Sequence, residues 1–228
     1  MNEGLYLVTG ASRGIGAEAA AALAAPGRTV GINFRASLDA AEDVAHRVEA
    51  KGGRPLLLRA DAASPAAVDA LFDGLPREPL EALVLNAGVP LRHARIHETS
   101  VEEFEAQWRV QALSAFLFCR RAAPLMAKRR AGRVVFVLTS AVEGPPPAYM
   151  SAYVSAKHAV LGLARSLEAE VGARGVSVRC LFPGMTDTDF IKGFPRPIVD
   201  AAREASATKS LATAAEVGAE VARLAEGR

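Results

Sequence analysis

The 228-residue sequence is poor in cysteine, aromatic residues and lysine, and it has no long apolar run. Its two cysteines, Cys119 and Cys180, each stand alone in an apolar segment, so we expect reduced core thiols and neither a disulfide nor a metal site. No stretch is long enough for a transmembrane helix, and the N-terminus lacks the charged and apolar regions of a signal peptide. These absences predict a cytoplasmic protein without a membrane role.

An excess of charge of one sign is also missing, because the net charge is only +2 and acidic residues are scattered among the arginines. This pattern argues against a nucleic-acid-binding surface, which needs clustered basic side chains. Half of the residues are hydrophobic, enough to bury a large core, and chains of this length commonly form one α/β domain. We therefore expect a single domain over residues 1–228.

Six short apolar runs of strand type alternate with helical patterns along the chain. They lie at 4–9, 29–34, 55–60, 81–86, 133–139 and 176–182. Strands that alternate with helices are joined by crossovers, which predicts a doubly wound parallel sheet covered on both faces, a Rossmann-type α/β fold. Helix starts are marked by Ser37, by Ser64, and by a capping pattern that fits either Thr99–Glu102 or Ser100–Glu103.

Three glycines stand between the first strand and the first helix, in the run Thr9-Gly-Ala-Ser-Arg-Gly-Ile-Gly16. Gly10 allows a tight turn, Gly14 lets the backbone approach a phosphate, and Gly16 lets the helix pack closely on the strand. A glycine-rich turn can serve only as a turn, but this position is where a dinucleotide-binding fingerprint belongs. The sequence thus predicts a nucleotide-binding turn.

A tyrosine and a lysine stand four residues apart, at Tyr153 and Lys157, and Ser140 precedes the tyrosine by thirteen residues. Residues four apart share one face of a helix, so the phenol and the ammonium should point into one cleft. A nearby positive charge lowers the pKa of a tyrosine, which would let Tyr153 exchange a proton near neutral pH. Such a pair often arises by chance, but the chain has five lysines against 22 arginines, so a lysine here runs against its composition.

Together these motifs resemble the short-chain dehydrogenase/reductase family, and most closely the 3-oxoacyl-(acyl carrier protein) reductases. The chain also has Asn86-Ala-Gly88 after the fourth strand and Pro183-Gly184 followed by Thr188, so the resemblance covers residues 1 to about 190. It implies a nicotinamide cofactor held by Thr9, Gly10, Ser12, Arg13, Gly14, Ile15, Gly16, Arg35, Asp61, Ala62, Asn86, Ala87, Gly88, Tyr153, Lys157, Pro183, Gly184, Thr186 and Thr188.

The cofactor that we predict is NADP(H), because the end of the second strand lacks the carboxylate that binds the ribose of NAD. Arg35 lies there and Arg13 lies in the glycine turn, so two guanidinium groups could grip a 2′-phosphate. Arg35 could also be an ordinary surface charge. The resemblance places Asp61 at the adenine amino group, and a helix-capping role for Asp61 is equally open.

The resemblance implies carbonyl reduction in which Ser140 holds the carbonyl, Tyr153 protonates its oxygen and Lys157 binds the nicotinamide ribose. Two departures from the family stand out. Gln111 takes the place of an asparagine that in the family positions a proton-relay water, so the relay could be shifted, weakened or kept through the backbone carbonyl alone. The chain also lacks the usual seventh strand after the helix at 214–225, which predicts a six-stranded sheet and a homodimer.

Three interpretations compete. The protein could be an NADPH-dependent ketoreductase acting on a 3-oxoacyl thioester or related ketone, a cofactor-binding regulator with little turnover, or a structural subunit. Only the enzyme explains why Ser140, Tyr153 and Lys157 are all intact. The segment 189–210 should form a lid over the substrate, and its sequence does not identify that substrate.

Two further groups of residues do not decide the function. Arg130 and Arg174 match positions that dock the acidic acyl carrier protein in the related reductases, although Arg130 also suits the C-terminus of a helix. His93 and His97 are four apart in a loop, but they have no evident third ligand, and we assign them no metal.

Overall fold

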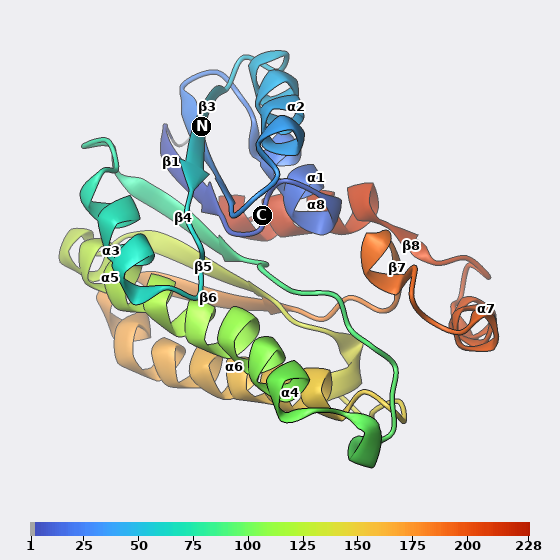
Figure 1. Cartoon of the computed structure of the whole chain (residues 1–228). Coiled ribbons are helices and arrows are strands. Elements are labelled where there is room, and N and C mark those ends of the chain that lie inside the picture. The colour runs from blue at the N-terminus through green and yellow to red at the C-terminus, as the bar shows by residue number, and fades with distance from the viewer. Residues whose placement is uncertain (1–2) are drawn as a thin grey trace.

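The computed structural model describes residues 3–228, which form a six-stranded parallel sheet with helices on both faces (Figure 1). The strands are β1 Gly4–Val8, β2 Arg28–Phe34, β3 Arg54–Arg59, β4 Leu80–Leu85, β5 Gly132–Val137 and β6 Val176–Leu181, in the spatial order β3-β2-β1-β4-β5-β6. The predicted α/β fold and all six strands are confirmed, each within two residues of its expected bounds. Within residues 3–228 no seventh strand joins this sheet, and β6 forms one of its edges.

Apolar side chains on the two faces of the sheet form two separate cores. One face is covered by α1 Gly14–Leu23, α2 Leu38–Glu49 and α8 Ala214–Glu226, and the other by α3 Pro65–Asp73, α5 Ser114–Arg129 and α6 Ser151–Val171 (Figure 1). Strands β1, β2 and β4 are buried along their whole length, as expected for central strands of a parallel sheet that is covered on both faces. In the part of the chain described, no helix has the length and apolar character needed to cross a membrane.

The strand order reverses between β1 and β4. The chain first moves outward from β1 through β2 to β3, and then returns to the other side of β1 to continue with β4, β5 and β6. In open parallel sheets, ligands bind in the crevice that such a reversal leaves at the carboxyl ends of the strands. The glycine turn after β1, Asn86 after β4 and Ser140 after β5 all lie at this edge of the sheet.

The helix that follows β4 contains an irregular turn. Helix α4 Val101–Trp108 passes through a π-helical turn, Arg109–Leu113, directly into α5. Its start resolves the two capping alternatives, because the Ser100 hydroxyl accepts from the Glu103 N–H and the Glu103 carboxylate accepts from the Ser100 N–H. π-helical turns are rare and often occur at functional sites, and this one contains Gln111.

A second, two-stranded sheet was not anticipated from the sequence. Its parallel strands are β7 Thr186–Asp187 and β8 Ala212–Thr213. The segment between them contains a short helical turn, Asp189–Ile191, and α7 Arg196–Ala205, which projects from the body of the molecule (Figure 1). No residue of α7 is fully buried. We call the segment between these two strands, residues 188–211, the lid.

Candidate active site

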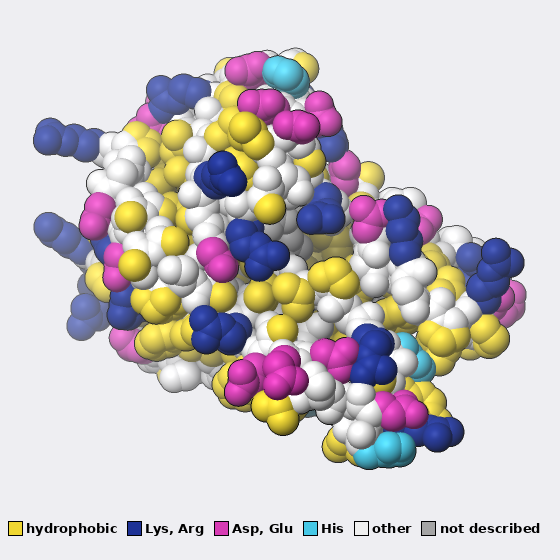
Figure 2. Space-filling model, viewed as in Figure 1, with side chains coloured by type: hydrophobic (Ala, Val, Ile, Leu, Met, Phe, Trp, Pro, Cys, Tyr) yellow, Lys and Arg dark blue, Asp and Glu magenta, His cyan; other side chains and the backbone are white. Residues whose placement is uncertain are grey.

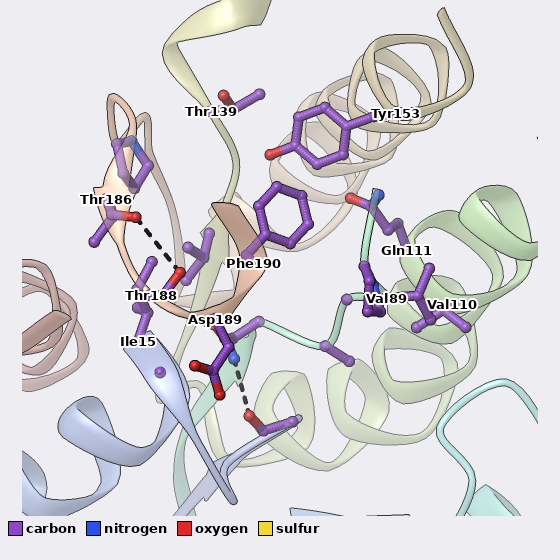
Figure 3. A pocket seen from close by; sticks show the side chains of 18 of the residues that line it. Ile15, Val89, Val110, Gln111, Thr139, Tyr153, Thr186, Thr188, Asp189 and Phe190 are labelled. Atoms are coloured by element: carbon purple, nitrogen blue, oxygen red, sulfur yellow. Dashed lines mark hydrogen bonds between the residues drawn. The ribbon is translucent and has the colours of Figure 1, made fainter. Parts of the chain in front are cut away.

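A cavity of about 720 Å³ opens at the carboxyl ends of the strands of the large sheet. The glycine turn, the loops after the strands and the lid form its walls (Figure 3). This volume lies within the range of small-molecule and cofactor sites. On the face shown in Figure 2, acidic and basic side chains are interspersed among hydrophobic ones, without a continuous basic surface.

The glycine turn is held by close main-chain contacts. Gly10 has a left-handed backbone with φ of +62°, and a Cβ added there would lie 2.9 Å from the Cα of Ala87. A Cβ added at Gly16 would lie 2.4 Å from the carbonyl oxygen of Gly10. Real Cβ atoms do not approach backbone atoms so closely, so both positions require glycine for packing, as the sequence predicted.

Thr9 and Asn86 join the ends of β1 and β4. The Thr9 hydroxyl donates to the Val84 carbonyl at 3.3 Å and accepts from the N–H groups of Asn86 and Ala87. The Asn86 amide nitrogen donates to the carbonyl oxygens of Thr9 and Gly10 at 3.1 and 3.2 Å. Thr9 is buried and makes all of these bonds within the protein, so it positions the turn and does not face the cavity.

The N-terminus of α1 faces the cavity without a competing side chain. Its cap residue, Arg13, makes no side-chain capping bond, and the first turn contains no acidic residue. A Cβ added at Gly14 would meet only Thr188, at 3.7 Å, which leaves room for close approach to the backbone. Helix N-termini attract anions. The turn therefore fits the pyrophosphate of a dinucleotide.

Two arginines line the end of the cavity where β2 stops. Arg13 and Arg35 are exposed, and within residues 3–228 neither forms a salt bridge. Asn33, two residues before Arg35, is buried and donates to the carbonyl oxygens of Leu58 and Ala60, both at 3.1 Å. Neither guanidinium group is held in a salt bridge, and the nearby Asp189 carboxylate interacts with Arg13 electrostatically. Asn33 instead connects β2 to the chain at and just beyond the end of β3.

Asp61 lies on the same side of the cavity and does not cap a helix in the usual way. One of its carboxylate oxygens accepts from the Ala63 N–H at 2.9 Å, which forms an Asx turn. The cap of α3 is Ser64, whose hydroxyl accepts from the Ala67 N–H. Of the two roles open for Asp61, helix capping thus belongs to Ser64, and Asp61 lines the cavity wall.

Tyr153 and Lys157 lie on α6 and are both buried, with Lys157 Nζ 5.8 Å from the centre of the Tyr153 ring. Burial raises the pKa of Tyr153 to about 12, and the Thr139 hydroxyl, toward which the phenol points, partly opposes that rise (Figure 3). The prediction that Lys157 lowers the pKa of Tyr153 is wrong for this structure, because the burial of the phenol dominates.

The Lys157 ammonium is directed to the main chain. Its Nζ donates to the Val137 carbonyl at 2.7 Å, and burial lowers the pKa of Lys157 to about 8. A charge out of contact with water is disfavoured, so the lysine loses its proton more easily than usual. The site thus contains a buried cation at the end of β5, beside the tyrosine ring.

Two hydroxyl groups follow β5, at Thr139 and Ser140, and both residues line the cavity. The Ser140 N–H donates to the Pro183 carbonyl at 2.9 Å, which joins the loops after β5 and β6. The Thr139 hydroxyl accepts from the Ala141 N–H at 3.3 Å, and it also forms the hydrogen bond that partly opposes the rise in the pKa of Tyr153. The spacing to Tyr153 favours Ser140 over Thr139 as the residue that holds the substrate, and both hydroxyls lie at the cavity.

Gln111 lies in the π-helical turn with 3% of its surface exposed. Its amide nitrogen donates to the Gln107 side-chain oxygen at 2.6 Å. A cavity of about 10 Å³, comparable to the space that one water molecule occupies, lies between Gln111, Ser114 and Lys157. The structure therefore brings Gln111 and Lys157 to the same small space, as the resemblance implied.

Most of the predicted cofactor residues come together. Those that line the large cavity are Gly10, Ser12, Arg13, Gly14, Ile15, Arg35, Asp61, Ala62, Asn86, Ala87, Gly88, Tyr153, Lys157, Pro183, Gly184, Thr186 and Thr188. Thr9 and Gly16 lie beneath the turn and act through its packing.

The sequence did not reveal the aromatic side chains of the lid. The Phe190 ring packs on Tyr153 with 5.4 Å between ring centres, and it also contacts Phe194 at 6.1 Å. His93 lies between Tyr149 and Phe194, at 5.1 and 5.8 Å, so this loop histidine belongs to an aromatic cluster. Phe190 and Phe194 precede α7, and no helical or strand spacing in the sequence marks them as residues that will pack.

Comparison with known proteins identifies the family. The short chain dehydrogenase profile matches residues 5–196. A short-chain type dehydrogenase/reductase of Picea abies is 34% identical over 229 residues, which cover 96% of this chain and 84% of the relative. The landomycin C-6 ketoreductase LanV, solved with NADP and rabelomycin, has a TM-score of 0.84 at 29% identity, covering 97% of this chain and 88% of LanV.

A 3-oxoacyl-[acyl-carrier protein] reductase of Brucella melitensis, solved with NAD, has a TM-score of 0.86 at 26% identity, covering 98% of this chain and 84% of that one. The matched profile includes the glycine turn, Asn86, Ser140 and the pair on α6. This protein is therefore an oxidoreductase that belongs to the short-chain dehydrogenase/reductase family.

Proposed function

We propose that this protein uses NADPH to reduce the carbonyl group of a ketone to a hydroxyl. The observation that carries this proposal is the position of Tyr153. Its phenol enters the cavity beside Lys157 and close to the loop of Ser140, across from a glycine turn that fits a dinucleotide (Figure 3). A proton donor in this place is what reduction of a bound carbonyl requires.

Each of the three side chains has a distinct task. A reduced nicotinamide, when bound, supplies the hydride. Tyr153, with a pKa of about 12, holds its proton at neutral pH and would transfer it to the carbonyl oxygen. Ser140 would hold the same oxygen through its hydroxyl. Lys157, with a pKa of about 8, is mostly charged at neutral pH and would stabilise the negative charge that Tyr153 acquires.

Two features support NADPH over NADH. The solved relatives hold either cofactor, so the preference must come from residues of this chain. Arg13 and Arg35 line the end of the cavity where the adenine ribose would lie, and a carboxylate that would repel a phosphate is missing from the end of β2. Guanidinium groups bind phosphate through paired, charge-assisted hydrogen bonds.

The substrate side of the cavity is largely apolar. Its walls include Met150, Phe190, Ile191, Phe194 and Ile198. We infer a ketone with an apolar body, either a 3-oxoacyl thioester or a related ketone of the kind that polyketide ketoreductases reduce. LanV, which has the same fold, was solved with rabelomycin bound.

We also propose that two copies of the chain associate through α4 and α5. Phe104, Trp108 and Phe116 are 41%, 43% and 48% exposed on these helices, although side chains of this size are usually buried. A carrier-linked substrate would bring an acyl carrier protein as a further partner, for which Arg130 and Arg174 are exposed cations.

The experiment that tests the proposed function is a direct assay. Purified protein is mixed with NADPH and either a short 3-oxoacyl thioester or an aryl ketone, and the loss of reduced cofactor and the appearance of the alcohol are followed. Turnover with at least one ketone is expected. Tight binding of NADPH without turnover of any ketone would instead favour a cofactor-binding regulator.

A further inference from the structure

Five aromatic rings in contact connect the proposed proton donor to the lid and to the loop after β4. The Phe190 ring lies 5.4 Å from the Tyr153 ring, measured between ring centres, and 6.1 Å from Phe194. His93 lies 5.8 Å from Phe194 and 5.1 Å from Tyr149. Aromatic pairs attract one another at separations of about 4.5–7 Å. These contacts attach the lid to the β4 loop and to the start of α6.

Main-chain hydrogen bonds hold the two phenylalanines of the lid in place. The Ile191 N–H donates to the Thr188 carbonyl at 3.2 Å, and the Phe194 N–H donates to the Ile191 carbonyl at 2.9 Å. Phe194 is buried, with 7% of its surface exposed, and the Phe190 ring packs on it. The Phe190 ring is therefore positioned before any substrate arrives, so little ordering is needed when a ligand binds against it.

The Phe190 ring is only partly buried and forms part of the cavity wall beside Tyr153 (Figure 3). A carbonyl oxygen that takes the proton of Tyr153 must come within about 3 Å of the phenol oxygen. Because the two rings are in contact, a group attached directly to that carbonyl carbon lies close enough to touch Phe190.

The other side chains around Phe190 are apolar. Met150, Phe194 and Ile198 line the same part of the cavity and pack in one cluster. Asp189, which precedes Phe190, pairs its carboxylate with Lys192 at 2.5 Å. An ionised group bound against Phe190 would be buried without a counter-ion, which is unfavourable, whereas an aromatic ring gains from contact with another ring beyond the burial of its area.

We propose that Phe190 is a specificity-determining residue that selects aryl ketones, in which an aromatic ring is attached directly to the carbonyl carbon to be reduced. The substrate ring lies against Phe190 while the carbonyl oxygen meets Tyr153. An alkyl ketone of the same size fills the same space without the contact between rings. The proposal rests on the proposed ketone reduction, and it names the class of ketone that the site prefers.

Two ketones of equal size test this by binding alone. Acetophenone and cyclohexyl methyl ketone have the same carbon skeleton, but only acetophenone has an aromatic ring. Each is titrated into the protein saturated with NADP⁺, and its affinity is measured by ligand-observed NMR. Acetophenone is expected to bind about three- to tenfold more tightly. A ratio of affinities near one, or no binding of acetophenone, would overturn the proposal.

Three variants assign the preference to the Phe190 ring. Phe190→Leu keeps an apolar wall without the ring, and should bring the ratio close to one by weakening acetophenone binding. Phe190→Tyr retains the ring and should retain the preference. Ile198→Val is the matched control, because it changes an apolar wall of the cavity that has no ring, and it should alter both affinities together and leave the ratio intact.

A preference that survives in Phe190→Leu would also overturn the proposal. NADP⁺ affinity, measured in each variant, establishes that the cofactor side of the fold is retained. Failure of the reductase proposal would look different. Acetophenone would then bind preferentially, and Phe190→Leu would remove that preference, but neither ketone would be reduced when NADPH is supplied.

Discussion

The two sides of the cavity are built in different ways. The cofactor side rests on main-chain contacts, such as the approach of Gly16 to the Gly10 carbonyl and the bonds of Asn86 beneath the turn. The substrate side rests on side chains of the lid, where α7 has no fully buried residue and Phe190 packs on Tyr153. The sheet therefore fixes the cofactor side, whereas the substrate side can change without disturbing it.

Tyr153 stands where the two sides meet, and its loss should have the largest effect. Tyr153→Phe removes the proton donor and keeps the ring that Phe190 contacts, so turnover should fall by about 10² to 10⁴. NADPH affinity, followed by cofactor fluorescence, should stay nearly unchanged because the lost hydroxyl acts on the substrate. A variant that retains most of the wild-type rate would remove Tyr153 from the mechanism.

The two hydroxyls after β5 can be separated by a matched pair of variants. Ser140→Ala should lower turnover by about 10², the usual effect of losing one donor to an oxygen that gains charge. Thr139→Val keeps the shape of the side chain and should lower turnover much less. If Thr139→Val lowered turnover more than Ser140→Ala did, Thr139 would be the residue that holds the substrate oxygen. Its hydroxyl already forms a hydrogen bond with the Tyr153 phenol.

Lys157 should make the stability of the cofactor-free protein depend on pH. Its pKa in the folded protein is about 8, below the ordinary 10.5, so the unfolded state binds more protons between these values. The free energy of unfolding should therefore rise with pH across that interval, by about 3.5 kcal/mol at most, since one pKa unit corresponds to about 1.4 kcal/mol.

Urea denaturation of the wild type and Lys157→Met, at several pH values, measures this contribution as a difference. The subtraction removes other groups that titrate in the same range, such as Cys180, whose pKa burial raises to about 11. A difference that does not change with pH would mean that the ammonium is better hydrated than its burial implies.

Glycine substitutions should affect the cofactor side according to the space around each Cβ. Gly16→Ala should lower the free energy of unfolding by about 1–3 kcal/mol and weaken NADPH binding, because the new methyl group meets the backbone of Gly10. Gly162→Ala is the control, since no atom lies within 4 Å of that position on α6, and it should stabilise the helix by up to about 1 kcal/mol. Equal effects would contradict the packing argument.

Arg35 should have the smallest of these effects, confined to the choice of cofactor. Arg35→Ala should reduce the preference for NADPH over NADH by about tenfold, and high salt should reduce it further by screening. Arg59→Ala is the matched control, because Arg59 donates to the Arg35 carbonyl but does not line the cavity. Equal affinities for the two cofactors in the wild type would show that both arginines are surface charges.

The same division explains how much could be predicted from the sequence. The strands, the glycine turn and the Tyr153–Lys157 pair depend on local spacing, and the structure places them as expected. The pKa of Tyr153 was predicted in the wrong direction, because burial depends on Phe190, which lies far along the chain. The orientation of the Gln111 amide could not be predicted from the sequence either. The Gln111 nitrogen donates to the Gln107 side-chain oxygen, and the Gln107 nitrogen in turn donates to the Pro90 carbonyl.

The pairing of β7 with β8 has a consequence for how the substrate side can evolve. The two short strands bring the ends of the lid together, so the intervening segment is a loop that leaves and rejoins the rest of the chain at neighbouring points. The entropy of closing such a loop rises slowly with its length, by about 0.6 kcal/mol for each doubling. A longer or shorter lid should therefore be tolerated at a small cost in stability, with Thr186 and α8 left in place. Exchange of the lid could change the substrate that the protein accepts while the rest of the fold is kept.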